Sequence, residues 1–334
     1  MMKATSIKDV FQMADRYCES ALLQQAHAAG IFELLRYPRT VDDVAAAKGW
    51  LRNKTAIMLD ALAALGLLLK EGKLYRNSPV ADNTLVREAP GYIGDLVEHE
   101  RLQWRLWEQL DAILRSSVAV PGQQDLSLPA NEYANEVFHR AMMQLAKDLV
   151  DLIARLPEWT RVRHVIDLAG GHGMYLAEVA KQHPHLTGEV WDLPSARKKA
   201  EHVIAAYGIA ERVRFVERDI RDQKSYEGVT ADAVMLHHCL HHFDQAGVRA
   251  IAEHVADLLP SSGLVTILDV HLESDRITPP QSALFSFYMM VNTVHGQVHP
   301  TDEIVSIFTE AGFAVETQLL DSLEDDYLII GRKR

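Results

Sequence analysis

The chain has 334 residues, with 34 Lys and Arg against 46 Asp and Glu, so its formal net charge at pH 7 is −12. With 48% apolar and 24% charged residues it has the composition of a globular protein, which excludes disordered, collagen-like and membrane-spanning classes. The longest unbroken apolar run, residues 61–69, is far shorter than the roughly 20 residues that cross a bilayer. The acidic balance disfavours nucleic acid and anionic membranes, and we expect neither as a partner.

The length suggests about two domains, and changes in sequence pattern place them at residues 1–95 and 96–334. The N-terminal segment lacks the apolar stretch of a secretory signal. Two cysteines, Cys18 and Cys239, cannot form a disulfide framework. Both observations favour the cytoplasm.

Three helices and a β-hairpin are predicted in the first domain, in chain order at residues 7–22, 44–47, 53–65 and 67–78. The apolar residues of the first helix recur at intervals of three and four, the pattern of one buried face. Thr40 followed by Asp43 predicts a capping box at the start of the second helix. Three helices and a hairpin form a winged-helix unit, a fold that often binds DNA. The third helix is almost wholly apolar, however, so we expect residues 1–95 to form the dimerisation domain of a homodimer.

Residues 96–157 are predicted to be mainly helical, with a polar loop at 121–132. After Pro157, strands alternate with helices, and the predicted strands are residues 162–168, 188–193, 213–219, 231–238, 264–270, 313–320 and 327–333. The last two read as a closing hairpin. This alternation predicts an α/β fold in which a doubly wound parallel sheet carries helices on both faces.

The first strand of this sheet runs through Asp167 into the glycine-rich turn A-G-G-H-G and then directly into a helix. Gly170, Gly171 and Gly173 allow the backbone to approach a ligand closely. Leu176 stands at the third glycine of a dinucleotide-binding fingerprint, and Asp167 would repel a pyrophosphate. The turn is therefore predicted to bind a ligand without phosphates.

Asp192 and Asp219 are predicted to close the second and third strands, next to Asp167 at the carboxyl edge of the sheet. Asp192 follows Gly173 by 19 residues, the spacing at which an acidic side chain accepts the ribose hydroxyls of a nucleoside. Three acidic strand ends describe a pocket for a cationic nucleoside, and S-adenosylmethionine has those properties.

At these residues the sequence resembles a known family, the two-domain S-adenosylmethionine-dependent small-molecule O-methyltransferases. This family includes plant caffeate- and hydroxyindole-type enzymes and bacterial relatives in pigment and antibiotic pathways. The resemblance covers nearly the whole chain, with Ala169 in place of the first glycine of the family's turn and D-L-P beginning at Asp192. It implies a Rossmann-like class I methyltransferase sheet, a winged-helix dimerisation domain, and cofactor contacts that include Asp219 and Ile220.

Four histidines crowd the end of the fourth strand, namely His237, His238, His241 and His242. Their spacing fits no familiar zinc signature, so we expect no metal. The resemblance places the catalytic base at His241 and the carboxylate that orients it at Asp269. A second glutamate beside the base in the plant enzymes falls here on Val298, so one carboxylate remains.

The resemblance also places the methyl acceptor between two segments rich in Met and Phe. The predicted contacts are Phe138, Met142, His242 and Met289, and methionine side chains suit a flat aromatic guest. We therefore expect methyl transfer to a hydroxyl of a small aromatic or enolic metabolite in secondary-metabolite or pigment biosynthesis. Two alternatives stay open: C- or N-methyl transfer on the same scaffold, and a winged-helix transcriptional regulator that senses a nucleoside.

Overall fold

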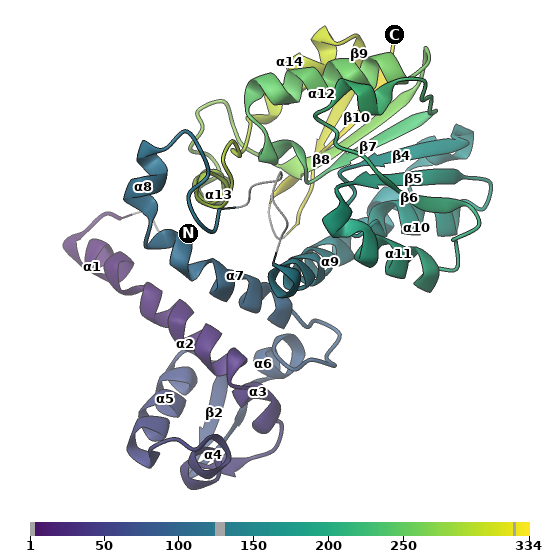
Figure 1. Cartoon of the computed structure of the whole chain (residues 1–334). Coiled ribbons are helices and arrows are strands. Elements are labelled where there is room, and N and C mark those ends of the chain that lie inside the picture. Colours follow the sequence, from purple (N-terminus) through teal and green to yellow (C-terminus); the bar gives the residue numbers. More distant parts are fainter. Residues whose placement is uncertain (1–3, 124–130, 323–324) are drawn as a thin grey trace. The chain divides into compact units, whose positions relative to one another are not determined.

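The helices and strands of the chain fall into two units, Met1–Trp104 and Arg105–Arg334. The computed structural model describes residues 4–123, 131–322 and 325–334 (Figure 1). The polar loop predicted at 121–132 therefore lies largely outside the described residues. Within the described ranges, no helix has both the length and the apolar character needed to cross a membrane.

The first unit is helical with a small antiparallel sheet, of strand order β1-β3-β2. Its elements are α1 (Ile7–Asp15), α2 (Tyr17–Ala28), α3 (Ile31–Leu34), β1 (Arg39–Thr40), α4 (Val41–Lys48), α5 (Arg52–Ala64), β2 (Leu68–Glu71), β3 (Leu74–Asn77) and α6 (Pro79–Thr84). The predicted capping box is confirmed, because the Asp43 amide donates to Thr40 Oγ1 at 3.2 Å and the Thr40 amide donates to Asp43 Oδ2 at 2.8 Å. The predicted hairpin is also confirmed, as β2 and β3.

The prediction of one helix with a buried face over residues 7–22 is wrong. The helix is interrupted at Arg16, between α1 and α2, and α1 buries none of its residues. Ile7 is 91% exposed, Phe11 66% and Tyr17 59%. The apolar core of this unit is built from side chains that begin at Leu22, and among the described residues α1 contributes none to it.

The second unit begins at Arg105, within α7 (Gly94–Trp107), so this helix includes residues of both units. Its helices and strands are α8 (Leu110–Arg115), α9 (Glu132–Ala154), β4 (His164–Leu168), α10 (Met174–Gln182), β5 (Thr187–Asp192), α11 (Arg197–Ala206), β6 (Val213–Glu217), β7 (Ala233–His237), α12 (Gln245–Leu258), β8 (Leu264–Val270), α13 (Pro280–Asn292), α14 (Thr301–Glu310), β9 (Phe313–Leu319) and β10 (Asp326–Lys333). Short 3-10 helices lie at Pro157–Arg161, Pro194–Ala196, Gln223–Tyr226 and Leu240–His242. Each predicted strand of this half is present.

These seven strands form one sheet in the order β6-β5-β4-β7-β8-β10-β9. The first five strands in that order are parallel, and β10 pairs antiparallel with both of its neighbours. Strand order reverses between β4 and β7, so the loops after these two strands diverge. The crevice outside the carboxyl ends of strands at such a switch point is where open α/β sheets bind ligands.

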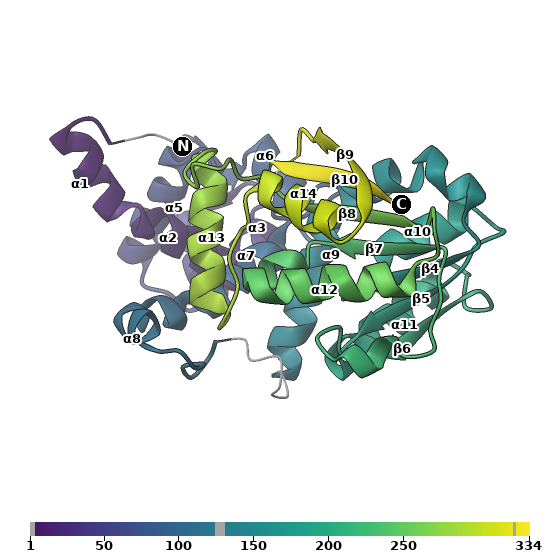
Figure 2. The same ribbon diagram turned by 90° about the horizontal axis from the view of Figure 1, so that it is seen from above.

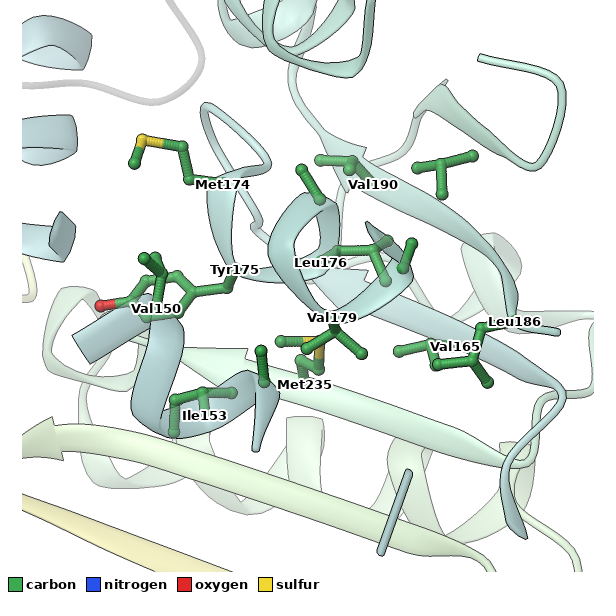
Figure 3. Close-up of a cluster of buried hydrophobic side chains, with 14 of the residues drawn as sticks. Val150, Ile153, Val165, Met174, Tyr175, Leu176, Val179, Leu186, Val190 and Met235 are labelled. Carbon is green, nitrogen blue, oxygen red and sulfur yellow. The ribbon is translucent and has the colours of Figure 1, made fainter. Parts of the chain in front are cut away.

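Side chains of alternating strand residues enter two separate cores, one on each face of the sheet. Val165 of β4 packs with α9, α10 and α11, whereas Ile166 packs with α12 and α14 on the other face. Figure 2 shows the second layer from above, with α12 and α14 over the strands. Figure 3 shows the first core around α10, where Leu176 and Val179 lie among Val165, Val190 and Met235. The helix after the glycine turn is therefore anchored firmly to the sheet.

Candidate active site

The turn between β4 and α10 adopts a backbone that most residues avoid. Ala169, Gly171 and Gly173 have φ angles of +51°, +53° and +72°. A Cβ added to Gly170 would lie 2.5 Å from Asp167 Oδ2 and 2.9 Å from Val190 Cγ1, so a side chain does not fit there. The methyl group of Ala169 is accommodated in a left-handed conformation that costs about 1–2 kcal/mol for a residue with a Cβ. The turn keeps its backbone open to the carboxyl edge of the sheet.

Two carboxylates lie beside this turn, Asp167 buried and Asp192 partly buried. Asp192, the last residue of β5, accepts hydrogen bonds from the amides of Gly171 (2.7 Å) and Leu193 (2.6 Å). Asp167 Oδ2 is buried and has no hydrogen-bond partner among the described residues. Burial raises the pKa of Asp167 to about 8 and that of Asp192 to about 6, and the Asp192 charge adds to the shift of Asp167. Near pH 7 Asp192 is therefore mostly ionised and Asp167 mostly protonated. Asp192 can accept hydrogen bonds from the hydroxyls of a ligand and attract its positive charge.

The prediction that all three aspartates close strands is correct only for Asp192. Asp167 is the penultimate residue of β4, and Asp219 lies two residues beyond the end of β6. Asp219 accepts a charge-assisted bond from Arg221 Nη2 at 2.6 Å, and this bond lowers its pKa. Ile220 is buried in the core beneath α12. The positive charge of Arg221 thus balances the negative charge of Asp219, the third aspartate of the predicted pocket.

His241 and Asp269 meet in a short buried hydrogen bond. His241 lies in the 3-10 helix after β7, and Asp269 lies near the carboxyl end of the neighbouring strand β8. His241 Nδ1 is 2.6 Å from Asp269 Oδ1, and the His241 amide donates to Asp269 Oδ2 at 3.3 Å. Burial opposes the charge on Asp269, but the His241 charge and hydrogen bond outweigh it and lower the pKa of Asp269. With Nδ1 held by the carboxylate, Nε2 is the nitrogen that can accept a proton from a ligand.

Aromatic and methionine side chains surround this pair. The Phe285 ring packs edge-on against His241 at 5.4 Å between centroids, and the His242 ring lies at 4.8 Å. A Cβ on Gly296 would meet both the His241 carbonyl oxygen (2.9 Å) and Met289 Cε (3.3 Å). The predicted residues His242 and Met289 are therefore close to His241. Burial, and next the charge of His241, lower the pKa of His242 to about 3, so its ring is neutral near pH 7.

Val298 is fully buried in an apolar cluster with Val270, Leu272 and Phe285. A carboxylate at this position would lose its hydration without gaining a cation. The second glutamate of the plant enzymes therefore has no counterpart at this place. Instead, the apolar cluster around Val298 includes Phe285, whose ring packs against His241.

Helix α9 brings the predicted residues Phe138 and Met142 to the same edge, both half-buried. His139 lies between them on this helix and is not among the residues predicted for the site. Its Nδ1 is 4.0 Å from the Cβ position of Gly171 and lacks a hydrogen-bond partner in the described chain. Burial lowers the pKa of His139 to about 4 and that of His172 to about 3, with neighbouring cations as a smaller cause. His139 and His172 are therefore neutral near pH 7. No motif spacing marks either residue in the sequence, and only the residue type could have suggested a place in the site.

The residues at the turn fit S-adenosylmethionine. Asp192 presents a partly buried carboxylate to hydroxyl donors, Asp167 keeps an unpartnered buried oxygen near it, and Gly170 brings the backbone closer to Asp167 and Val190 than any residue with a Cβ could. The charge of Asp192 would repel a phosphate, whereas it would attract a sulfonium cation. The strand order and this turn define a class I S-adenosylmethionine-dependent methyltransferase.

Comparisons with known proteins agree with this class. Residues 124–314 match the model of an O-methyltransferase domain, and residues 11–87 match that of an O-methyltransferase dimerisation domain. The chain is 29% identical to the N,N-dimethyltransferase OxyT of Streptomyces rimosus, over 98% of this chain and 96% of that protein. It is 31% identical to the 3-hydroxy-5-methyl-1-naphthoate 3-O-methyltransferase of Streptomyces sahachiroi, over 81% of this chain and 79% of that protein. A structure of an O-methyltransferase family protein from Burkholderia thailandensis matches with a TM-score of 0.93 and 42% identity, over 99% of both chains.

The chain therefore belongs to the O-methyltransferase family. It is an S-adenosylmethionine-dependent methyltransferase with an N-terminal dimerisation domain, which supports a homodimer. The expected fold class and cofactor are thereby confirmed.

Proposed function

We propose that the enzyme methylates the hydroxyl oxygen of a small aromatic or enolic metabolite, with His241 as general base. The observation that carries the proposal is the buried 2.6 Å hydrogen bond between His241 Nδ1 and Asp269 Oδ1. An oxygen acceptor must lose a proton, and a positioned imidazole next to a buried carboxylate is built to accept one. The likeness to a naphthoate 3-O-methyltransferase supports the same acceptor chemistry.

S-adenosylmethionine supplies a methyl group activated by a positive sulfur, and the acceptor oxygen displaces that sulfur. Asp192 and the backbone of Gly170, Gly171 and Gly173 hold the nucleoside, with Asp167, Asp219 and Ile220 as further contacts. His241 Nε2 takes the proton of the acceptor hydroxyl as the new O–C bond forms. Asp269 holds the ring in the tautomer that leaves Nε2 as base, and it stabilises the imidazolium that results.

The acceptor pocket is formed by apolar and polarizable side chains, for which we propose Phe138, Met142, His242 and Met289. Phe285 stacks against the Tyr288 ring at 5.9 Å and packs edge-on against His241, so an aromatic wall leads away from the base. Such a wall favours a flat, aromatic acceptor and gives little penalty for changes in its outline.

We further propose that residues 1–95 form the dimer interface and that residues 96–334 carry the transfer reaction. Exposed Ile7, Phe11 and Tyr17 would then be covered by a second copy of the chain. Burying such a patch is favourable by about 25 cal/mol per Å² of apolar surface.

N-methylation is the second candidate. A neutral amine carries its own lone pair and does not need a base before it attacks. The likeness to an N,N-dimethyltransferase and the apolar Val298 beside His241 both favour this possibility. If it holds, the His241–Asp269 pair would only align the acceptor.

One experiment separates the two candidates. The purified chain is incubated with methyl-labelled S-adenosylmethionine and a panel of phenols, enols and anilines, in parallel with His241→Asn. O-methylation predicts labelled methyl ethers from phenols or enols, and their rate falls in the variant. Labelled anilines formed equally by both proteins would refute the general-base proposal.

A further inference from the structure

A second carboxylate, that of Asp326, lies near the His241–Asp269 pair. It belongs to β10, a strand that the sequence patterns do not associate with this pair. Asp326 is the first residue of β10, and it lies opposite Val270 in the antiparallel pairing of β10 with β8, while Tyr327 lies opposite Asp269. The start of β10 therefore meets the carboxyl end of β8. Asp326 and Asp269 stand on neighbouring strands at the same edge of the sheet.

The Asp326 side chain is buried but only partly satisfied. Its residue exposure is 1%, and Oδ2 accepts a hydrogen bond from Ser322 Oγ at 2.7 Å. Oδ1 has no hydrogen-bond partner among the described residues, yet it lies 3.9 Å from His238 Nδ1. An unpartnered carboxylate oxygen is costly to bury. The imidazole of His238 lies close enough to this oxygen to compensate its charge when the ring is protonated.

His238 is held in an uncommon conformation at the end of β7. Its φ is +51°, and its amide donates to the Leu268 carbonyl oxygen at 2.7 Å. A left-handed backbone costs a residue with a Cβ about 1–2 kcal/mol, and such strain concentrates at functional sites. The neighbouring strand fixes this conformation and with it the place of the ring.

The His238 ring lies near two groups, Tyr175 of the helix that follows the glycine turn and the proposed base His241. Its centroid is 6.2 Å from Tyr175 at the start of α10 and 6.5 Å from His241. Its side chain keeps 23% of its surface exposed, whereas Asp326 is covered. Burial raises the pKa of Asp326, His238 and Ser322 oppose that shift, Asp269 adds to it, and His241 again opposes it. The two carboxylates and two imidazoles therefore form one electrostatic unit.

We propose that His238 is a second imidazole that contacts the methyl acceptor, and that Asp326 is the residue that positions it. This inference rests on the proposed O-methylation. The negative Asp326 carboxylate favours His238 with a proton on each ring nitrogen. Nδ1–H then faces Asp326, and Nε2–H donates a hydrogen bond to the acceptor oxygen, whose own proton is donated to His241 Nε2. Two hydrogen bonds of about 2.8 Å that meet at one oxygen, together with the width of the rings, fit the 6.5 Å separation of His238 and His241. His241 then removes the proton from a hydroxyl that His238 holds in place.

The test uses asparagine substitutions that preserve shape. Asp326→Asn keeps an acceptor for Ser322 but loses the charge, and His238→Asn suits a left-handed backbone, which asparagine tolerates. Asp325→Asn is the matched control, because Asp325 is an exposed neighbour whose φ of +54° also suits asparagine. The measurements are kcat and KM for the acceptor, affinity for S-adenosylhomocysteine, and the thermal midpoint of each variant.

We expect Asp326→Asn and His238→Asn each to lower kcat/KM for the acceptor by about 10- to 100-fold, the loss for a hydrogen bond that involves a charged group. Cofactor affinity should stay within about twofold, and Asp325→Asn should match the wild type. The double variant should lose little more than either single variant, because Asp326 acts through His238.

Three results would overturn the inference. The first is activity of Asp326→Asn equal to that of Asp325→Asn. The second is multiplication of the two losses in the double variant, which would mean that Asp326 does not act through His238. The third is a loss of cofactor affinity in His238→Asn equal to its loss in kcat/KM, which would assign His238 to the cofactor. Each is distinct from failure of the proposed function, which would leave His241→Asn fully active.

Discussion

Replacing His241 by asparagine removes the proposed base and leaves its partner satisfied. The asparagine Nδ2 lies near the place of His241 Nδ1, so a donor to Asp269 Oδ1 remains. His241→Ala would instead leave the buried Asp269 without this donor, and breaking a buried pair in that way costs about 3–5 kcal/mol of stability. The asparagine variant thus tests the chemistry with less risk to the fold.

The expected loss follows from the proton that must move. A phenol with a pKa of about 10 and a free imidazole of about 6.5 differ by roughly 3.5 units, or about 5 kcal/mol, so complete transfer before methylation is uphill. The proton must therefore move together with the methyl group. A positioned base contributes about 10²- to 10⁴-fold to such a step, which is about 3–5 kcal/mol of barrier. We expect kcat of His241→Asn to fall by this factor.

The assay measures initial rates with a phenolic acceptor at saturating cofactor, and S-adenosylhomocysteine affinity by calorimetry. Affinity should be nearly unchanged, because the base acts only on the acceptor. Raising the pH should partly restore the rate of His241→Asn, because a phenol then ionises without help. His202→Asn, at an exposed position of α11, is the matched control and should keep full activity. Near-full activity of His241→Asn at neutral pH would refute general-base catalysis.

Four further outcomes test other parts of the account. Asp192→Ala should weaken S-adenosylhomocysteine binding by about 1.5–3 kcal/mol, the value of a hydrogen bond to a charged group, and unchanged affinity in calorimetry would remove Asp192 from the cofactor site. The pKa of Asp167 is raised to about 8, so between about pH 4 and pH 8 the folded chain holds a proton that the unfolded chain releases. The contribution of this group to the free energy of unfolding should therefore fall as pH rises from about 4 to about 8. Asp167→Asn should make the free energy of unfolding, measured by denaturant titration, less dependent on pH in this range. Ala169→Gly should raise the free energy of unfolding by up to about 1 kcal/mol by relieving the left-handed alanine, and a lower thermal midpoint would contradict this. Phe11→Asp should shift a micromolar dimer toward monomers in sedimentation, whereas a wild-type chain that is already monomeric would overturn the assembly.

Most of the second unit could be predicted because its signals are local. Apolar runs of five to eight residues bounded by turns predict the strands, and Asp192 follows from its distance to Gly173. The pairing of His241 with Asp269 is what the family resemblance implies, and the adjacent parallel strands β7 and β8, which end at the same edge, bring the two residues together.

What the sequence could not reveal depends on contacts between distant segments. Asp326 reaches the site because β10 pairs antiparallel with β8, and no periodicity encodes that register. The exposure of the apolar face of α1 could not be predicted either. A pattern of apolar residues indicates that a helix face is buried, but it does not indicate whether the same chain or a second copy buries it. Asp219 was misplaced because its strand ends at Glu217, where local sequence alone does not mark the boundary.

The atom that receives the transferred methyl group distinguishes base-catalysed O-methylation from the alternative reactions. The wild-type chain and His241→Asn are each supplied with S-adenosylmethionine carrying a ¹³C-labelled methyl group and an accepted phenol, and the product is examined by NMR. We predict that the label appears as a methyl ether on oxygen and that its rate of formation falls about 10²- to 10⁴-fold in the variant. Label on carbon or nitrogen, or a methyl ether formed equally fast by both proteins, would contradict the account.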